Sequence, residues 1–147
     1  MPDIFDDIER LHDQMRRRLV RQVYLATHPA GFLPERSWEP PLDVYQTEDA
    51  ILVVMEVAGV ELSDVDVVVD RQILTVSGIR REQGERNRVY MQMEIRYGPF
   101  ERRIRLPGSV DTGKVSAVMK NGFLRIHMPV SARSEHGTIT VVPITVE

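Results

Sequence analysis

The feature that most constrains the fold is a change of apolar period at about residue 42. From there to about residue 130, apolar side chains recur at every second position, which is the period of a β-strand. Ile51, Val53, Met55 and Val57 alternate with a second, largely apolar set, which predicts a central strand covered on both faces. Further strand-length runs cover residues 65–70, 73–77, 89–95, 100–106, 115–120 and 123–128. Seven or so short strands predict an all-β fold, an immunoglobulin-like antiparallel β-sandwich.

The strongest local signal is the dipeptide Asn121-Gly122 between the last two of these runs. Asn and Gly both tolerate positive φ, so this pair favours a two-residue hairpin turn. A second hairpin is predicted around Arg71-Gln72, and Pro129 ends the last strand.

Residues 1–40 form a separate N-terminal arm in this reading. Ile4, Ile8, Leu11, Met15 and Leu19 recur at spacings of three and four, which predicts an amphipathic helix from residue 3 to about residue 26. Prolines then break the helix before residue 41. We therefore divide the chain into the arm (1–40), a sandwich domain (41–130) and an extended C-terminal tail (131–147).

Composition excludes several classes of function. The chain has no cysteine, so disulfides and thiolate chemistry are absent and a reducing, cytoplasmic location is expected. Its net charge is −3, with basic and acidic residues mixed along the chain, so we expect no nucleic acid as a partner. No apolar stretch approaches the length of a membrane span, so we do not expect a membrane as a partner either. The four histidines lack the spacing of a zinc site, and no phosphate-binding or nucleophile motif occurs. We assign no catalytic residue, metal or cofactor, although a pair of carboxylates facing each other across a cleft stays open.

Residues 117–124 have the pattern A-x-x-x-N-G-x-L, through Ala117, Asn121, Gly122 and Leu124. This pattern resembles a signature of the α-crystallin domain of small heat shock proteins, and it belongs to an ordered set of such matches. Residues 100–107 resemble its F-x-R-x-x-x-L-P strand, and residues 42–45 its first strand. Residues 57–60 keep the spacing of another motif but have Ala58 where the family commonly has proline.

The resemblance implies a C-terminal anchor that fills a groove at a sheet edge. Ile144 and Val146 match the family's I-x-I/V pattern, and two β-branched residues separated by one point to the same side of a strand. Residues 139–141 have the same pattern, and Val142-Pro143-Ile144 nearly has it, so other registers stay open. We favour Ile144 and Val146, because Pro143 preorganises an extended approach. The implied groove lies between the two strands that carry Val65, Val67, Val69, Val115 and Ala117.

The resemblance also implies a dimer made by strand exchange. The strand with Val89, Tyr90, Met91 and Met93 would pair with the strand near Asp43 and Tyr45 of a second subunit. The alternative is a hairpin within one chain, but the connection is long for a compact domain.

The function implied is that of an ATP-independent holdase, an oligomer of dimers that binds partly unfolded client proteins and prevents their aggregation. Its candidate client-binding or oligomer-core residues are the large apolar side chains of the arm: Ile4, Phe5, Ile8, Leu11, Met15, Leu19, Phe32, Leu33 and Trp38. A different class, a CS or p23-like sandwich adaptor of an ATP-driven chaperone, is the main alternative, and an enzyme on a β-sandwich is the third.

Overall fold

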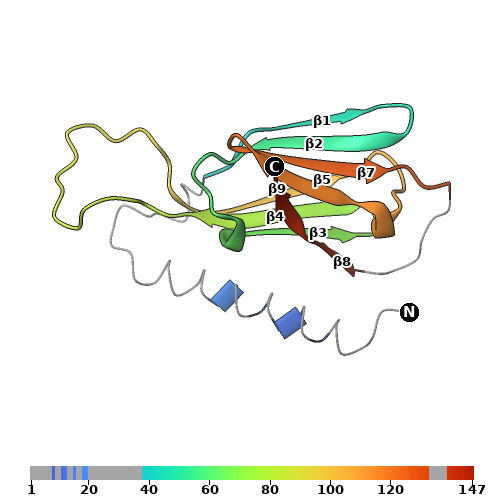
Figure 1. The fold of residues 1–147 in the computed structure, drawn as a ribbon, viewed down its shortest axis with the longest axis horizontal. Helices are drawn as coiled ribbons and strands as arrows, with labels where there is room; N and C mark the ends of the chain where they lie inside the picture. The colour runs from blue at the N-terminus through green and yellow to red at the C-terminus, as the bar shows by residue number, and fades with distance from the viewer. Residues whose placement is uncertain (1–7, 9–10, 13–14, 16–17, 20–37, 133–138) are drawn as a thin grey trace.

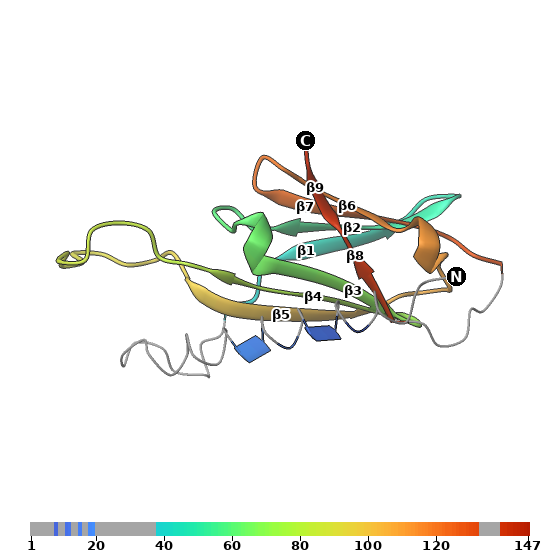
Figure 2. The ribbon, with the colours of Figure 1, turned by 60° about the horizontal axis from the view of Figure 1, so that its bottom comes forward.

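In the computed structural model, two β-sheets pack face to face, and a long loop projects from one end of the sandwich (Figures 1 and 2). The structure describes residues 8, 11–12, 15, 18–19, 38–132 and 139–147.

The first sheet has five strands in the order β1-β2-β7-β6-β9. Their bounds are β1 (Leu42–Gln46), β2 (Ala50–Glu56), β7 (Phe123–Pro129), β6 (Ser116–Lys120) and β9 (Ile144–Val146). All neighbours in this sheet are antiparallel except β9, which runs parallel to β6.

The second sheet has four antiparallel strands in the order β5-β4-β3-β8. Their bounds are β5 (Gly98–Arg105), β4 (Ile73–Arg80), β3 (Val65–Asp70) and β8 (Ile139–Val142). Two short 3-10 helices, η2 (Leu62–Asp64) and η3 (Thr112–Lys114), precede β3 and β6.

The core lies between the sheets and is built by the alternation that the sequence shows. In β2, Ile51, Val53 and Met55 are fully buried, while Leu52 and Val54 on the other face are half-buried. In β3, Val65, Val67 and Val69 point into the same core, which Leu74, Val76, Leu124 and Ile126 complete. The predicted all-β sandwich is therefore confirmed.

The two predicted hairpins have the expected turn chemistry. Asn121 and Gly122, with φ of 52° and 80°, connect β6 to β7. Arg71, with φ of 56°, lies in the equally short connection between β3 and β4. Both turns place residues of positive φ between strands, as tight antiparallel hairpins require.

The structure differs from one sequence prediction and describes only part of another. The strand predicted over 89–95 is not formed, because a strand needs a hydrogen-bonding partner and the single chain pairs this segment with none of its described strands. The helix predicted over residues 3–26 falls mostly outside the described residues. Residues 8, 11–12, 15 and 18–19 have helical backbone, and no α-helix is given as an element in the described part of the chain.

Candidate functional site at the sheet edges

On one side of the sandwich, β3 of one sheet and β6 of the other are the strands that neighbour the C-terminal tail. Val67, Val69 and Ala117, which are predicted to line a groove there, are buried to 1% exposure or less. Val65 is buried as well, while Val115 is half-buried and packs on the core. Val65, Val67 and Val69 therefore lie in β3 and Ala117 in β6, while Val115 directly precedes β6. The groove itself stays a prediction.

The C-terminal tail of the same chain pairs with both of these strands. β8 pairs antiparallel with β3, with Val142 opposite Val67, and β9 pairs parallel with β6, with Ile144 opposite Ala117. Pro143 stands between them, where the tail crosses from one sheet to the other (Figure 2). The tail thus covers the outer edges of both β3 and β6, which would otherwise present unpaired backbone groups.

The residues that point inward from the tail are Val142 and Ile144. Val142 is buried and belongs to the core cluster, and Ile144 is half-buried and packs against that cluster. Val146 shares the face of Ile144 but is 67% exposed. Of the predicted pair Ile144 and Val146, the structure therefore packs only Ile144. Its buried partner is Val142, which lies on the opposite sheet.

The end of the tail is held by polar contacts. The backbone N–H of Glu147 donates to the carbonyl of Met119 at 3.2 Å, and the Lys120 ammonium lies 3.3 Å from the Glu147 carboxylate. Both side chains of this ion pair are about half exposed or more, so we assign the apolar contacts, and not this pair, as the main attachment.

The hairpin signature has a structural role beside the groove. Gly122 accepts a hydrogen bond from the N–H of Val57 at 2.8 Å, and a Cβ at this glycine would lie 3.2 Å from Ala58. Ala117 is buried and lies opposite Ile144 of the tail, and Leu124 is fully buried in the core. The signature therefore shapes the β6–β7 edge that receives the tail.

On the side away from the tail, β1 is an end strand that pairs only with β2 among the described strands. Val44 lies opposite the fully buried Val53 and so points to the core face, yet Val44 is 40% exposed. Asp43 and Tyr45 point to the other face and are exposed as well. The open edge of β1 is thus partly apolar on both of its faces.

The long connection between β4 and β5, residues 81–97, is the loop that projects from the sandwich in Figures 1 and 2. Its apolar side chains at alternate positions, Val89, Met91, Met93 and Ile95, are all exposed, with Met91 at 95%. Tyr90 is exposed too, and its hydroxyl accepts a hydrogen bond from Arg88, which raises the pKa of that guanidinium. The structure does not bring this segment onto β1 of its own chain.

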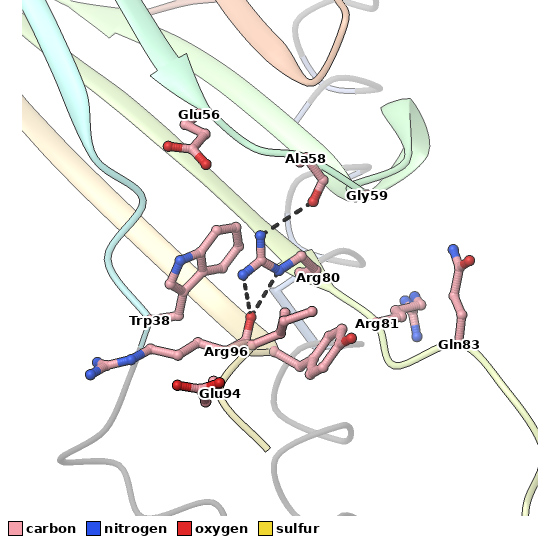
Figure 3. A pocket seen from close by; sticks show the side chains of 11 residues that line it. Trp38, Glu56, Ala58, Gly59, Arg80, Arg81, Gln83, Glu94 and Arg96 are labelled. Carbon is pink, nitrogen blue, oxygen red and sulfur yellow. Dashed lines mark hydrogen bonds between the residues drawn. The ribbon is translucent and has the colours of Figure 1, made fainter. Parts of the chain in front are cut away.

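The base of this loop is held by Arg80, at an open pocket lined by Trp38, Glu56, Glu94 and Tyr97 among others (Figure 3). Arg80 donates hydrogen bonds to the carbonyl oxygens of Arg96 and Ala58, and its guanidinium lies over the ring of Trp38. Burial lowers the pKa of Arg80, opposed by the charges of Tyr97 and Glu56. An arginine stays charged despite such a shift.

The described part of the arm exposes its apolar residues. Ile8, Leu11, Met15 and Leu19 are each about half exposed. Trp38, grouped with them in the sequence analysis, is instead buried at 6% exposure and packs edge-on against Phe100, so it is a core residue and not a free client-binding side chain. Ile4, Phe5, Phe32 and Leu33 lie outside the described residues.

Two features of these edges are missing from the sequence prediction. The sequence does not single out Arg80, because it begins a charged stretch that has the pattern of a solvent-exposed loop. Its contact with the Trp38 ring becomes evident only in the folded structure. Val142 enters the sequence prediction only through the near match Val142-Pro143-Ile144, and the preferred anchor, Ile144 and Val146, leaves it out. Val142 pairs with one sheet and Ile144 with the other, and this change of sheet at Pro143 is visible only in the strand topology.

No group of three His, Asp or Glu side chains that could hold a metal ion is found among the residues the structure describes. The described part of the chain also contains no helix long and apolar enough to cross a membrane.

A model of the Hsp20/alpha crystallin family matches residues 43–145. The chain belongs to this family. The match covers the sandwich and the tail through Thr145, so the resemblance identified from the motifs is confirmed, and with it a chaperone role in general terms.

Relatives match both the whole chain and the domain alone. Small heat shock protein C2 of Rickettsia felis is 28% identical over 148 residues, 96% of each chain. The 17.0 kDa class II heat shock protein of Zea mays is 36% identical over 87 residues, which cover 58% of this chain and 56% of that protein.

Solved structures of the family share the fold. Heat shock protein 16.0 from Schizosaccharomyces pombe superposes with a TM-score of 0.61 at 28% identity, over 69% of this chain and 94% of that one. HspA from Xanthomonas axonopodis gives a TM-score of 0.58 at 31% identity, over 64% of this chain and 95% of that one. A small heat-shock protein from Xylella fastidiosa, described as having a distinct high order structure, gives 0.59 at 28% identity, over 70% and 95%.

Proposed function

We propose that the chain is an ATP-independent holdase: an oligomer of strand-exchanged dimers that binds partly unfolded proteins and keeps them from aggregating. The observation that carries the proposal is that one chain of the Hsp20/alpha crystallin family has both an exposed apolar segment, 89–95, and a strand, β1, whose outer edge pairs with no other described strand. Assembly and client binding need no nucleotide, since the burial of apolar surface drives both.

Strand exchange explains why the 81–97 loop is apolar and still projects into solvent. A monomer that exposes Val89, Met91, Met93 and Ile95 together leaves a contiguous apolar face in water, which is typical of a protein–protein contact. Their spacing of two puts them on one side of an extended segment. Added to the edge of β1 in a second subunit, the segment gains backbone partners and covers an apolar surface at the same time.

The faces of the two partners can be matched. Val44 is the exposed residue of β1 that points to the core side, and it needs apolar neighbours beyond the end of the sheet. We therefore assign the odd-numbered face of the exchanged segment, with Met91 at its centre, to the side of Val44. Tyr90 and Gln92 then lie on the side of Asp43 and Tyr45.

The tail is the proposed link between dimers. Val142 and Ile144 make the same contacts whether the groove belongs to their own subunit or to another, because the pairing of β8 and β9 depends only on β3 and β6. Exchange of tails between subunits would therefore join dimers at no loss of contacts. We propose Val142 and Ile144 as the anchor, in place of Ile144 and Val146.

The client-binding surface is proposed to be the exposed apolar side chains of the arm. Ile8, Leu11, Met15 and Leu19 recur at helical spacing and are exposed together. Unfolded proteins expose apolar segments of many sequences, so a non-directional apolar stripe suits a holdase better than a shaped pocket would.

The experiment is light scattering of a heat-labile test protein, with and without the chain near subunit stoichiometry, in nucleotide-free buffer. Suppressed scattering is the expected result. A variant with Leu11→Ser and Met15→Ser provides the matched comparison, because it changes the stripe and leaves the sandwich intact. Undiminished aggregation at every temperature below the unfolding of the chain itself would overturn the holdase and favour the adaptor of an ATP-driven chaperone.

A further inference from the structure

One guanidinium joins the two ends of the 81–97 loop. Arg80 is the last residue of β4, where the loop leaves the sandwich, and Arg96 lies two residues before β5, where the loop returns. The Nε and Nη2 atoms of Arg80 both donate to the carbonyl oxygen of Arg96, at 2.8 and 2.5 Å (Figure 3). The outgoing and returning legs of the loop are therefore tied together at its base.

The same guanidinium is fixed to the body of the sandwich. Its Nη1 atom donates to the carbonyl oxygen of Ala58 at 3.3 Å, in the turn that follows β2. Its Cζ atom lies 3.7 Å from the centre of the Trp38 ring, and Trp38 in turn packs edge-on against Phe100 with ring centres 4.9 Å apart. Since Trp38 and Phe100 are core residues, the position of Arg80 is set by the core.

We infer that Arg80 is a positioning residue for strand exchange: it aims the 81–97 loop away from its own sandwich, so that residues 89–95 are presented to a second subunit. The inference rests on the proposed function and adds to it the residue that determines the direction of the loop. Without this tie, the two legs of the loop can separate, and the exposed segment samples many directions. Fewer of those conformations are competent to bind, which weakens the dimer.

Lysine at this position would not suffice. A lysine ammonium would keep the charge above the Trp38 ring, but it is a compact donor and cannot spread a fork between two carbonyl oxygens on different segments. The variant Arg80→Lys thus separates the geometric role from the charge. Arg105→Lys is the matched control, since Arg105 is exposed near the far end of β5 and the same chemical change is made there.

The experiment measures dimer dissociation of the full-length chain by sedimentation velocity across a dilution series, together with hydrogen exchange of the core strands. Arg80→Lys is expected to raise the dimer dissociation constant at least about tenfold. Amide protection in β2 and β7 is expected to be unchanged in both variants. Arg105→Lys is expected to dimerise like the wild-type chain.

Trp38 supplies an independent readout, because it is the only tryptophan of the chain. Its fluorescence should become more accessible to acrylamide in Arg80→Met, which removes the cation over the ring and keeps the apolar stem. Arg80→Met is also the second variant should Arg80→Lys fold poorly, and its dimer is expected to weaken in the same way.

The outcomes separate the two claims. If the wild-type chain dimerises and Arg80→Lys and Arg80→Met have the same dimer dissociation constant as the wild type, the role of Arg80 is overturned. The proposed function is then left standing. Equal losses in Arg80→Lys and Arg105→Lys, or a loss of core protection in step with dimer loss, also overturn it. A wild-type chain that forms no dimer at any concentration instead overturns strand exchange itself.

Discussion

Arg102 of β5 donates a hydrogen bond from its Nη1 atom to the carbonyl oxygen of Pro40, 62 residues earlier in the chain, at 2.9 Å. Arg102 lies opposite Val76 and thus points into the sandwich, while Pro40 directly precedes the segment that leads into β1. The contact connects the two sheets on the side that the tail leaves open. The two sheets are therefore connected differently on the two sides of the sandwich. On one side the apolar tail pairs with both sheets, and on the other a charged hydrogen bond joins β5 to the segment before β1.

Arg102→Ala is expected to lower the free energy of unfolding by about 1–3 kcal/mol, because it leaves the Pro40 carbonyl without its charged donor. Thermal unfolding followed by circular dichroism measures the change. Arg103→Ala, on the exposed outer face of the same strand, is the control and should stay within about 0.5 kcal/mol. Equal effects of the two substitutions would contradict the bridging role of Arg102.

Gly78→Ala is expected to destabilise the sandwich by about 3 kcal/mol or more, since an added methyl group overpacks the core. A Cβ at Gly78 would lie 2.4 Å from the carbonyl oxygen of Asp64 and 2.7 Å from the Phe100 ring. Gly108→Ala has open space around its Cβ and serves as the comparison in the same chemical-denaturation series. Tolerance of alanine at both positions would show that β4 and η2 are less closely packed than described.

Replacement of Val142 and Ile144 by Ala is expected to release the tail and shift the native mass toward dimers, because the anchor loses its buried side chains. Val146→Ala should leave the mass unchanged, as this side chain is mostly exposed. Native mass spectrometry and hydrogen exchange of residues 139–146 measure both effects. The reverse order, with Val146 more sensitive than Val142, would restore the register that was predicted from the sequence.

Met91→Glu is expected to weaken the dimer about 100-fold or more, because a charge would be placed on the apolar face of the exchanged segment. Gln92→Glu makes the same change in charge one position along, on the opposite face, and should have little effect on the dimer. Sedimentation velocity distinguishes the two variants. A stronger effect at Gln92 would mean that the other face of the segment turns toward the partner.

The sequence predicted most of the sandwich because its signals there are local. Alternation along 50–56 and 65–70, and the turn residues Asn121 and Gly122, depend on neighbours within a few positions, so pattern and structure agree. The tail's position beside β3 and β6 could also be anticipated, since the resemblance to the family implied that these strands receive it.

What the sequence did not predict depends on contacts between distant segments. Arg80 gains its role only when Trp38 and Ala58, both more than twenty residues away, are folded against it. Val142 is buried in the core as the last residue of β8, just before the tail changes sheets at Pro143. Residues 89–95 have the pattern of a strand without forming one here, because backbone pairing needs a partner edge and the pattern does not contain it.

Trans cross-linking tests the central structural claim most directly, and the absence of cysteine from the chain makes it clean. One preparation carries Val44→Cys, and others carry Val89→Cys, Met91→Cys, Met93→Cys or Gln92→Cys, each alone. After mixing and oxidation, at least one of the three apolar positions should give a disulfide-linked pair with Val44→Cys, and Gln92→Cys should not. If all three fail to cross-link under conditions where the chain is dimeric, the segment does not add to the edge of β1, and strand exchange is wrong.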